Sequence, residues 1–337
     1  MTLVQFHDMG SASDFSAPCE YVADIINLDS GIDDSNSLIQ SPAEASEAIV
    51  DFLEERIVAV LEKYNSRPLL MLSGGVDSIL LATILAKHAP NTLAVTFIDP
   101  FTDPNSLEEF NIASAVSTSL GLEHVVTDLD SSEYESLVRE TVTKLGCTDP
   151  WEILAGVILL ACEQEGRKHN ATGAIFTGAG ADALFLGGSN ETIASNDEYH
   201  QKILAKVHKN FIRERQIPDF YERLIDDADR HIQVWQTIAG FELAMRIPVK
   251  LSRGKSGKED KALLRQTLVS LGADPEHAWT TKNPMQISSG GIDSLVALAR
   301  MVLNDSGTHS TYSNPLDEPL EFTAARLFLE LTYNSHE

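Results

Sequence analysis

The stretch LLMLSGGVDSILLATIL, residues 69–85, decides the fold class. A short apolar run ends at Leu72, two glycines follow, and a helical apolar pattern begins near Asp77. Because glycine has no Cβ, the backbone N–H groups of Gly74 and Gly75 can approach an anion closely. The positive end of the following helix favours a phosphate at the same place. The stretch therefore predicts a strand, a phosphate-binding turn and a helix.

The side chains of this turn predict a magnesium-nucleotide site. Ser73 and Ser78 supply hydroxyl donors for phosphate oxygens. Asp77 would repel a phosphate directly, so its expected role is to hold a Mg²⁺ ion that bridges the phosphates. The turn lacks the Gly-Lys-Ser/Thr ending of a Walker loop, which argues against a kinase that transfers the γ-phosphate.

Further apolar runs predict a doubly wound parallel sheet and hence an α/β fold. Strands are expected in PLLML (68–72), TLAVTFI (92–98), HVVTDL (124–129) and AIFTG (174–178), with helices between them at 77–88, 106–120 and 132–165. Buried strands that alternate with helices are typical of βαβ units, in which ligands bind at the carboxyl ends of the strands. We therefore expect the site in the loops after Leu72, Ile98 and Phe176.

The chain is expected to divide into three parts. Residues 1–40, rich in Ser, Asp and Asn, would form an N-terminal arm or cap with one strand-like run, YVADIINL (21–28). An α/β core over 41–190 would open with a helix, whose start is indicated by Ser41, Pro42 and Glu44. The remaining 191–337 would be a mainly helical C-terminal part, with helices at 196–215, 219–246, 259–271, 291–304 and 318–333.

A second loop, AIFTGAGADALFLGG (174–188), repeats the order of strand, glycine turn and helix. If its strand neighbours the first one, Asp182 would face Asp77 across the cleft. Two carboxylates together with phosphate oxygens are typical ligands of nucleotide-bound Mg²⁺. A further copy of the first motif, SSGGIDSLVALA (288–299), follows TKNPMQI, which leaves little room for a buried strand. We interpret that copy as a glycine-rich turn before a helix.

The pairing of SGGVDS with TGAGADALFLGG resembles the synthetase domain of asparagine synthetases and β-lactam synthetases, which has the ATP-pyrophosphatase fold. The resemblance continues towards the C-terminus and covers residues 45–305. Three further stretches are similar to later parts of that domain: FELAMRIPVK (241–250), KEDKALLRQ (258–266) and TTKNPMQISSG (280–290). It implies an ATP-dependent carbon–nitrogen ligase that uses Mg²⁺, adenylates a carboxylate with release of pyrophosphate, and forms an amide.

The resemblance also implies roles for individual residues. Pyrophosphate and the metal would be bound by Ser73, Gly74, Gly75, Asp77 and Ser78, with Asp182 as the second metal carboxylate. The adenosine site would be lined by Leu72, Phe97, Thr177 and Gly178. Lys282 matches the catalytic lysine that the family uses on the α-phosphate, where it would offset the charge that develops during the reaction.

Several departures from the family bear on the reaction. Asparagine synthetases carry an N-terminal glutaminase domain with a cysteine after Met1, whereas this chain has Thr2, so we expect no ammonia from glutamine. Ala179 replaces a glutamate of the second loop, and a methyl group can neither bind ammonium nor accept a proton. The amine is therefore expected on a larger substrate. The candidate base is Glu242, and the other options are Glu191, Tyr199 and His200; Thr280 also replaces an arginine of the lysine loop.

The leading expectation is an AMP-forming ligase that joins a small-molecule carboxylate to an amine, closing a lactam when both belong to one molecule, as in natural product biosynthesis. The alternative within the family is an ammonia-dependent asparagine synthetase. Alternatives of other classes are a tRNA-modifying ATP pyrophosphatase and a non-catalytic nucleotide-binding relative.

Composition narrows the expected partners. The 337 residues carry a formal net charge of −25, which opposes binding to nucleic acid. No run of 18 apolar residues occurs, and the first residues do not resemble a secretory signal, so we expect no membrane partner. Three scattered cysteines favour reduced thiols in the cytoplasm over a zinc site. A homodimer is compatible with these features.

Overall fold

A computed structural model of the chain describes residues 38–103, 107–189, 191–210, 219–280, 289–305 and 320–335. Its centre is a parallel sheet of five strands in the order β3-β2-β1-β4-β5. The strands are β1 (Leu69–Met71), β2 (Leu93–Thr96), β3 (Glu123–Val126), β4 (Ile175–Thr177) and β5 (His231–Gln233). The strand order reverses between β1 and β4, which is where open α/β sheets bind ligands. The predicted α/β fold class is confirmed.

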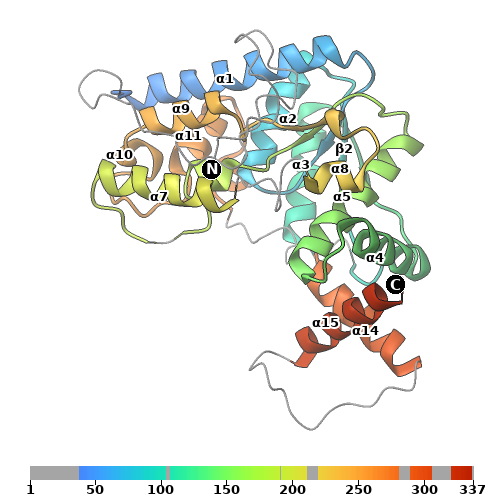
Figure 1. Cartoon of the computed structure of the whole chain (residues 1–337). Helices are drawn as coiled ribbons and strands as arrows, with labels where there is room; N and C mark the ends of the chain where they lie inside the picture. Colours follow the sequence, from blue (N-terminus) through green and yellow to red (C-terminus); the bar gives the residue numbers. More distant parts are fainter. Residues whose placement is uncertain are drawn as a thin grey trace.

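Helices cover both faces of this sheet (Figure 1). The core on one side of the sheet contains side chains from α1 (Pro42–Lys63), α2 (Val76–His88), α3 (Glu108–Leu120), α6 (Ala181–Leu184), α7 (Asn196–Asn210), α9 (Ile238–Arg246), α10 (Val249–Ser252), α11 (Ala262–Ser270) and α12 (Pro275–Ala278). The core on the other side contains side chains from α4 (Ser131–Leu145), α5 (Pro150–Lys168), α8 (Asp219–Leu224), the 3₁₀ turn η3 (Ala228–Arg230), α14 (Gly291–Asp305) and α15 (Leu320–Asn334), of which α14 and α15 pack on α4 and α5.

The strand side chains explain this two-sided covering. Leu70 and Phe176 belong to the core beneath α1 and α2, whereas Leu69 and Ile175 belong to the core beneath α4 and α5. Successive side chains of a strand point to opposite faces, so continuous apolar runs are buried on both sides. The central strands β1, β2 and β4 therefore lie in the interior, whereas the edge strand β3 is partly exposed.

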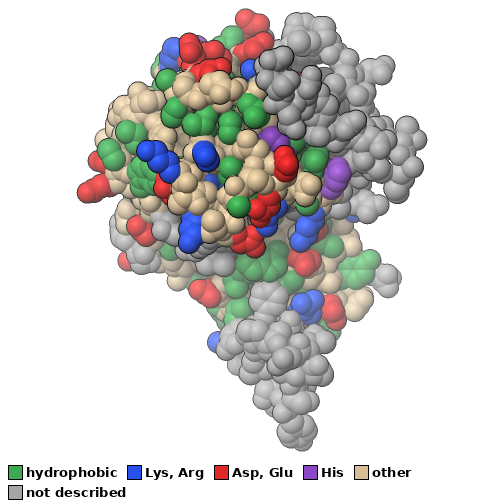
Figure 2. Space-filling model, turned by 90° about the vertical axis from the view of Figure 1, so that its left-hand side faces the viewer, with side chains coloured by type: hydrophobic (Ala, Val, Ile, Leu, Met, Phe, Trp, Pro, Cys, Tyr) green, Lys and Arg blue, Asp and Glu red, His purple; other side chains and the backbone are tan. Residues whose placement is uncertain are grey.

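The C-terminal helices form an extension of the body. Figure 1 shows α14 and α15 below α4, at the end of the molecule opposite α1. Within the described residues, no single helix is long and apolar enough to cross a membrane, although α4 and α5, bent by 114° relative to each other, pass that test as a pair. In the described part of the face in Figure 2, Lys and Arg side chains are scattered among acidic and hydrophobic ones.

The predicted elements agree with the structure up to residue 190, with one exception. The expected single helix at 132–165 is two helices, because the chain turns at Gly146 (φ 61°) and a new helix starts at the N-cap Asp149. The N-cap of α1 is as predicted, with Ser41 accepting a hydrogen bond from the backbone of Glu44. The strand-like run at 21–28 lies outside the described residues.

The region after residue 190 is helical, but it also supplies a strand. The expected helix at 219–246 is wrong in its middle, where β5 pairs with β4. β5 has the sequence His231-Ile232-Gln233, with one apolar residue between two polar ones, so no continuous apolar run marks it as a strand. The sheet is thus completed from outside the predicted 41–190 core.

Candidate active site

The first glycine turn, between β1 and α2, is closed by its own serines. The Ser78 hydroxyl donates to the Ser73 carbonyl at 2.7 Å and accepts from the Ser73 backbone N–H at 3.2 Å. The Ser73 hydroxyl accepts from the N–H of Gly75 at 3.3 Å. These bonds hold the turn at the start of α2, where the helix dipole and free N–H groups favour an anion.

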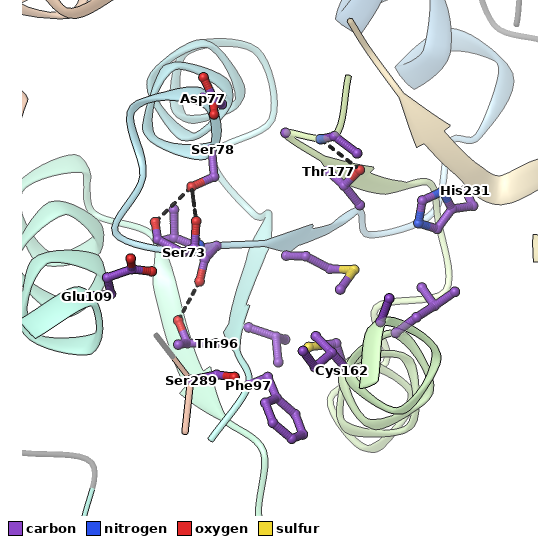
Figure 3. Close-up of a pocket in the computed structure, with 18 of the residues that line it drawn as sticks. Ser73, Asp77, Ser78, Thr96, Phe97, Glu109, Cys162, Thr177, His231 and Ser289 are labelled. Atoms are coloured by element: carbon purple, nitrogen blue, oxygen red, sulfur yellow. Dashed lines mark hydrogen bonds between the residues drawn. The ribbon is translucent and has the colours of Figure 1, made fainter. Parts of the chain in front are cut away.

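Gly74 is required by the neighbouring helix. A Cβ at Gly74 would lie 2.7 Å from the Cα of Glu109 and 2.8 Å from its carbonyl oxygen. The backbone of α3 therefore passes directly against the turn. In Figure 3 the Glu109 carboxylate lies beside the Ser73 end of the pocket. Glu109 is not recognisable as a site residue from the sequence, because its position depends on how α3 packs.

The second glycine loop lies against the first. A Cβ at Gly178, just after β4, would be 3.0 Å from the Cβ of Asp77 and 3.1 Å from the backbone nitrogen of Ser78. Gly180 has φ 96°, a value that side-chain-bearing residues rarely adopt, and α6 begins directly after it. The two turns that the sequence predicts to face each other are therefore in contact.

Asp77 and Asp182 converge on one cation, the ammonium of Lys261. The Lys261 Nζ atom lies 2.6 Å from Oδ2 of Asp77 and 2.5 Å from Oδ1 of Asp182. The side chains of Lys261 and Asp77 are 1% exposed, whereas that of Asp182 is 56% exposed. Two carboxylates from neighbouring strand ends thus share a single positive charge.

Lys261 reaches this position from the turn before α11. Its backbone is left-handed, with φ 48° and ψ 39°, at the N-cap of the helix. The buried guanidinium of Arg253 holds the preceding turn and the second loop together, since it donates to the carbonyls of Gly257 at 3.2 Å and Leu186 at 3.0 Å and also to that of Ser189. The sequence signal of this segment is limited to several Lys, Arg and Gly residues in KLSRGKSGKEDK (250–261).

A second lysine supports the loop after α6. Lys206 on α7 donates to the carbonyl of Gly187 at 2.9 Å. Burial lowers the pKa of Lys206, while the nearby negative charge of Asp182 acts in the opposite direction. The positive charges around Asp182 therefore come from two separate elements, α7 and the start of α11.

A pocket of about 300 Å³ opens beside the two loops at the ends of β1, β2 and β4. It contains most of the predicted nucleotide residues: Leu72, Ser73, Asp77, Ser78, Phe97, Thr177, Gly178 and Asp182. Gly74 and Gly75 lie in the adjoining turn. Its other wall is largely apolar or aromatic and includes Trp151, Ile158, Leu159, Phe220 and Tyr221. Glu109 and Glu152 are the acidic lining residues outside the Asp77–Asp182 pair, among those that the structure describes.

Two residues at the α5 side of the pocket are held in their neutral forms. Burial lowers the pKa of His231 to about 3, and its ring stacks on Tyr221 with a centroid distance of 3.8 Å. Burial also raises the pKa of the Cys162 thiol well above its ordinary value. Both residues line the pocket, and Figure 3 shows them away from the serine turn. A cysteine thiolate nucleophile paired with an imidazolium is therefore not available here.

Of the two predicted catalytic residues, the structure describes one, and it does not line this pocket. Glu242 lies on the exposed face of α9 and does not line it, and Lys282 falls outside the described residues. Of the other options for a base, Glu191 is exposed and paired with Lys202, and Tyr199 is buried with its hydroxyl 2.6 Å from the Ser252 hydroxyl. Ala179, by contrast, does line the pocket.

The further copy of the glycine motif opens a helix, as predicted. α14 begins at Gly291, and Gly290 has φ 75°. A Cβ at Gly290 would lie 2.6 Å from a carboxylate oxygen of Asp99 and from the Thr102 hydroxyl, so the turn packs on the loop after β2. Ser289 of this turn lines the pocket, which the sequence did not predict.

Residues 65–237 match the asparagine synthase family. The chain belongs to that family. The matched stretch includes both glycine loops and all five strands, and the family implies the use of ATP. No curated protein matches the sequence.

Two solved structures are similar to this chain at low sequence identity. An NH3-dependent NAD synthetase from Campylobacter jejuni has 16% identity and a TM-score of 0.31, with 55% of this chain and 82% of that chain covered. An NMN synthetase from Francisella tularensis has 14% identity and a TM-score of 0.34, with 89% of this chain and 97% of that chain covered.

Proposed function

We propose that this member of the asparagine synthase family is an AMP-forming amide ligase for a small-molecule carboxylate and an amine. The observation that supports it is the convergence of Asp77 and Asp182 on one cation beside the Ser73–Ser78 turn. The turn offers backbone and hydroxyl donors to a pyrophosphate, and the pair offers carboxylate oxygens to a divalent metal.

The carboxylate pair fits a phosphate-bound magnesium ion. Among the residues that the structure describes, no group of three or more His, Cys, Asp or Glu side chains could hold a metal by itself. Mg²⁺ in nucleotide sites is commonly bound by one or two carboxylates, with substrate phosphates and water as its other ligands. Bound between Asp77 and Asp182, the ion would neutralise charge on the leaving pyrophosphate.

The protein's own groups would act mainly by positioning and electrostatics. A substrate carboxylate oxygen attacks the α-phosphorus of ATP, and the bond to the bridging oxygen breaks as pyrophosphate leaves. The Ser73–Ser78 turn holds the departing oxygens, and Lys282 is proposed to offset charge at the α-phosphate. The amine nitrogen then attacks the acyl carbon, AMP leaves, and the nitrogen loses a proton.

The pocket lining favours an amine on a larger substrate. The glutamate that asparagine synthetases use for ammonium is replaced by Ala179, and the apolar wall offers contacts that ammonium cannot make; together these features favour an amine-bearing substrate over ammonia. We propose that Glu109 or Glu152 holds the amine instead, and that the aromatic and aliphatic wall contacts a partly apolar substrate. Closure of a lactam is one form of this reaction, in which both groups belong to one molecule.

Product analysis tests the proposal. The protein is incubated with ATP, magnesium and a panel of carboxylic acids and amines, and nucleotides are separated by chromatography. We expect AMP and pyrophosphate only with the right carboxylate, and D182N should lower the rate by about 100-fold or more. D51N, which removes an exposed carboxylate of α1, should match the wild type. ADP and orthophosphate as products would refute the proposal.

A further inference from the structure

Lys261 lies where the proposed metal would bind. Its Nζ atom is within 2.6 Å of carboxylate oxygens from both Asp77 and Asp182. These two residues are 184 and 79 positions away in sequence, so the contact depends on the complete fold. At 1% exposure, the ammonium is removed from water and compensated by the two carboxylates.

The surroundings are built to admit this lysine. A Cβ at Gly187 would lie 2.0 Å from Oδ1 of Asp182 and 2.7 Å from Cε of Lys261, so only glycine leaves room for the pair. The next residue, Gly188, donates its N–H to Oδ1 of Asp260 at 3.0 Å, which fixes the loop to the residue before Lys261. Lys261, whose backbone is left-handed, therefore follows directly after a residue that is bonded to the second glycine loop.

An ammonium and a magnesium ion cannot share this position. Mg²⁺ takes oxygen ligands at about 2.0–2.1 Å and carries two positive charges. With Nζ between the carboxylates, an incoming ion would lie close to a like charge in a mostly buried site, where repulsion is strong. The metal can bind both carboxylates only if the lysine moves away.

We propose that Lys261 and the divalent metal compete for the position between Asp77 and Asp182. The protein alone then binds the metal weakly, and the metal enters together with a triphosphate. The displaced ammonium remains within reach of the phosphates, which supply the negative charge that it loses. The inference rests on the proposed function only because it names a triphosphate as the group that binds the displaced Lys261 ammonium.

Metal binding without nucleotide tests the competition directly. Mn²⁺ suits the same carboxylate ligands as Mg²⁺ and can be followed by electron paramagnetic resonance. K261M should bind Mn²⁺ at least about tenfold more tightly than the wild type. K258M, which removes an exposed lysine of the same turn, should match the wild type. Adding D182N to K261M should abolish the gain, because one of the two carboxylates is then lost.

Folding of the variant provides a second measurement. Without Lys261 the charge of buried Asp77 loses a partner, so K261M should be less stable than the wild type and should regain stability in MgCl₂. NaCl at the same ionic strength serves as the control. If K261M does not fold alone, its recovery in MgCl₂ but not in NaCl supports the competition, and failure to recover in MgCl₂ overturns it.

The outcomes separate this inference from the proposed reaction. Equal Mn²⁺ affinity in the wild type and K261M would overturn the competition, even if AMP is formed. A gain of affinity in K261M with no AMP formed from any substrate would support the competition and leave the amide ligase proposal without support.

Discussion

Gly74 shows how the absence of a single side chain positions the first glycine turn. The nearest atoms to a Cβ at this residue belong to the α3 backbone, which cannot rotate away as a side chain could. Gly74 therefore lets α3 bring Glu109 to the pocket, and we propose that it also exposes backbone N–H groups to a bound phosphate.

We predict that G74A destabilises the protein by about 1–3 kcal/mol, because the added methyl group must displace backbone. The AMP-forming activity should fall as well, since the turn moves. Chemical denaturation and product analysis measure the two effects. G121A is the control: its Cβ would have open space, but φ 68° makes it cost roughly 1–2 kcal/mol without loss of activity. Wild-type stability and activity in G74A would contradict the prediction.

The residues of the site differ in how far the sequence reveals them. Asp77 and Asp182 can be predicted as site residues from the two glycine loops, because each motif by itself indicates a strand, a turn and a helix. Lys261 does not follow, since a lysine among several others becomes a site residue only when Arg253 and the glycines fold its turn against the second loop. Glu242 is predicted as a candidate base because Ala179 leaves that role unfilled, but the register of α9 turns its side chain to solvent.

Among the elements, β5 joins the part of the chain after residue 190 to the sheet. It pairs in parallel with β4, and its first residue, His231, is buried and stacked on Tyr221. The strands β1 and β2 lie within continuous apolar runs, at 68–72 and 92–98, which make them evident in the sequence. β5 has a single apolar residue, Ile232, between His231 and Gln233, so it is defined by its hydrogen-bonded neighbour. The fold class was therefore predictable, whereas the last strand was not.

We predict that the free energy of unfolding depends on pH because His231 is buried. Its pKa is about 3 in the folded protein, below the ordinary value near 6.5 of an unfolded chain. The unfolded state therefore binds more protons as pH falls from about 6.5 towards 3, and stability decreases over that window. From pH 7 to 5.5 we expect a loss of about 1 kcal/mol from this residue.

The measurement is the free energy of unfolding in urea at several pH values. H231F keeps an aromatic ring against Tyr221 but cannot take up a proton, so its stability should fall less steeply between pH 7 and 5.5. Parallel pH profiles for the wild type and H231F would show that His231 does not contribute.

For the whole molecule, the net charge of −25 is the dominant electrostatic feature. Charge of one sign opposes the compact state, and salt screens it over about 10 Å at 0.1 M. Local ion pairs such as Lys87 with Glu54 are largely exposed and contribute little in comparison.

We therefore predict that NaCl stabilises the protein, on the order of 1 kcal/mol between low and physiological ionic strength. Thermal unfolding over a salt series measures it, with sucrose at matched osmolality as the uncharged control. A decrease of the melting temperature with NaCl would mean that attractive pairs outweigh the general repulsion.

The pairing of β5 with β4 has a consequence for any shortened form of this protein. A fragment that stops before His231 would leave β4 as an open edge, whose unpaired N–H and C=O groups invite self-association. A fragment that ends just beyond Gln233 would close that edge but still lack the ammonium that neutralises the two carboxylates. Minimal versions should therefore extend through α11, where both requirements are met.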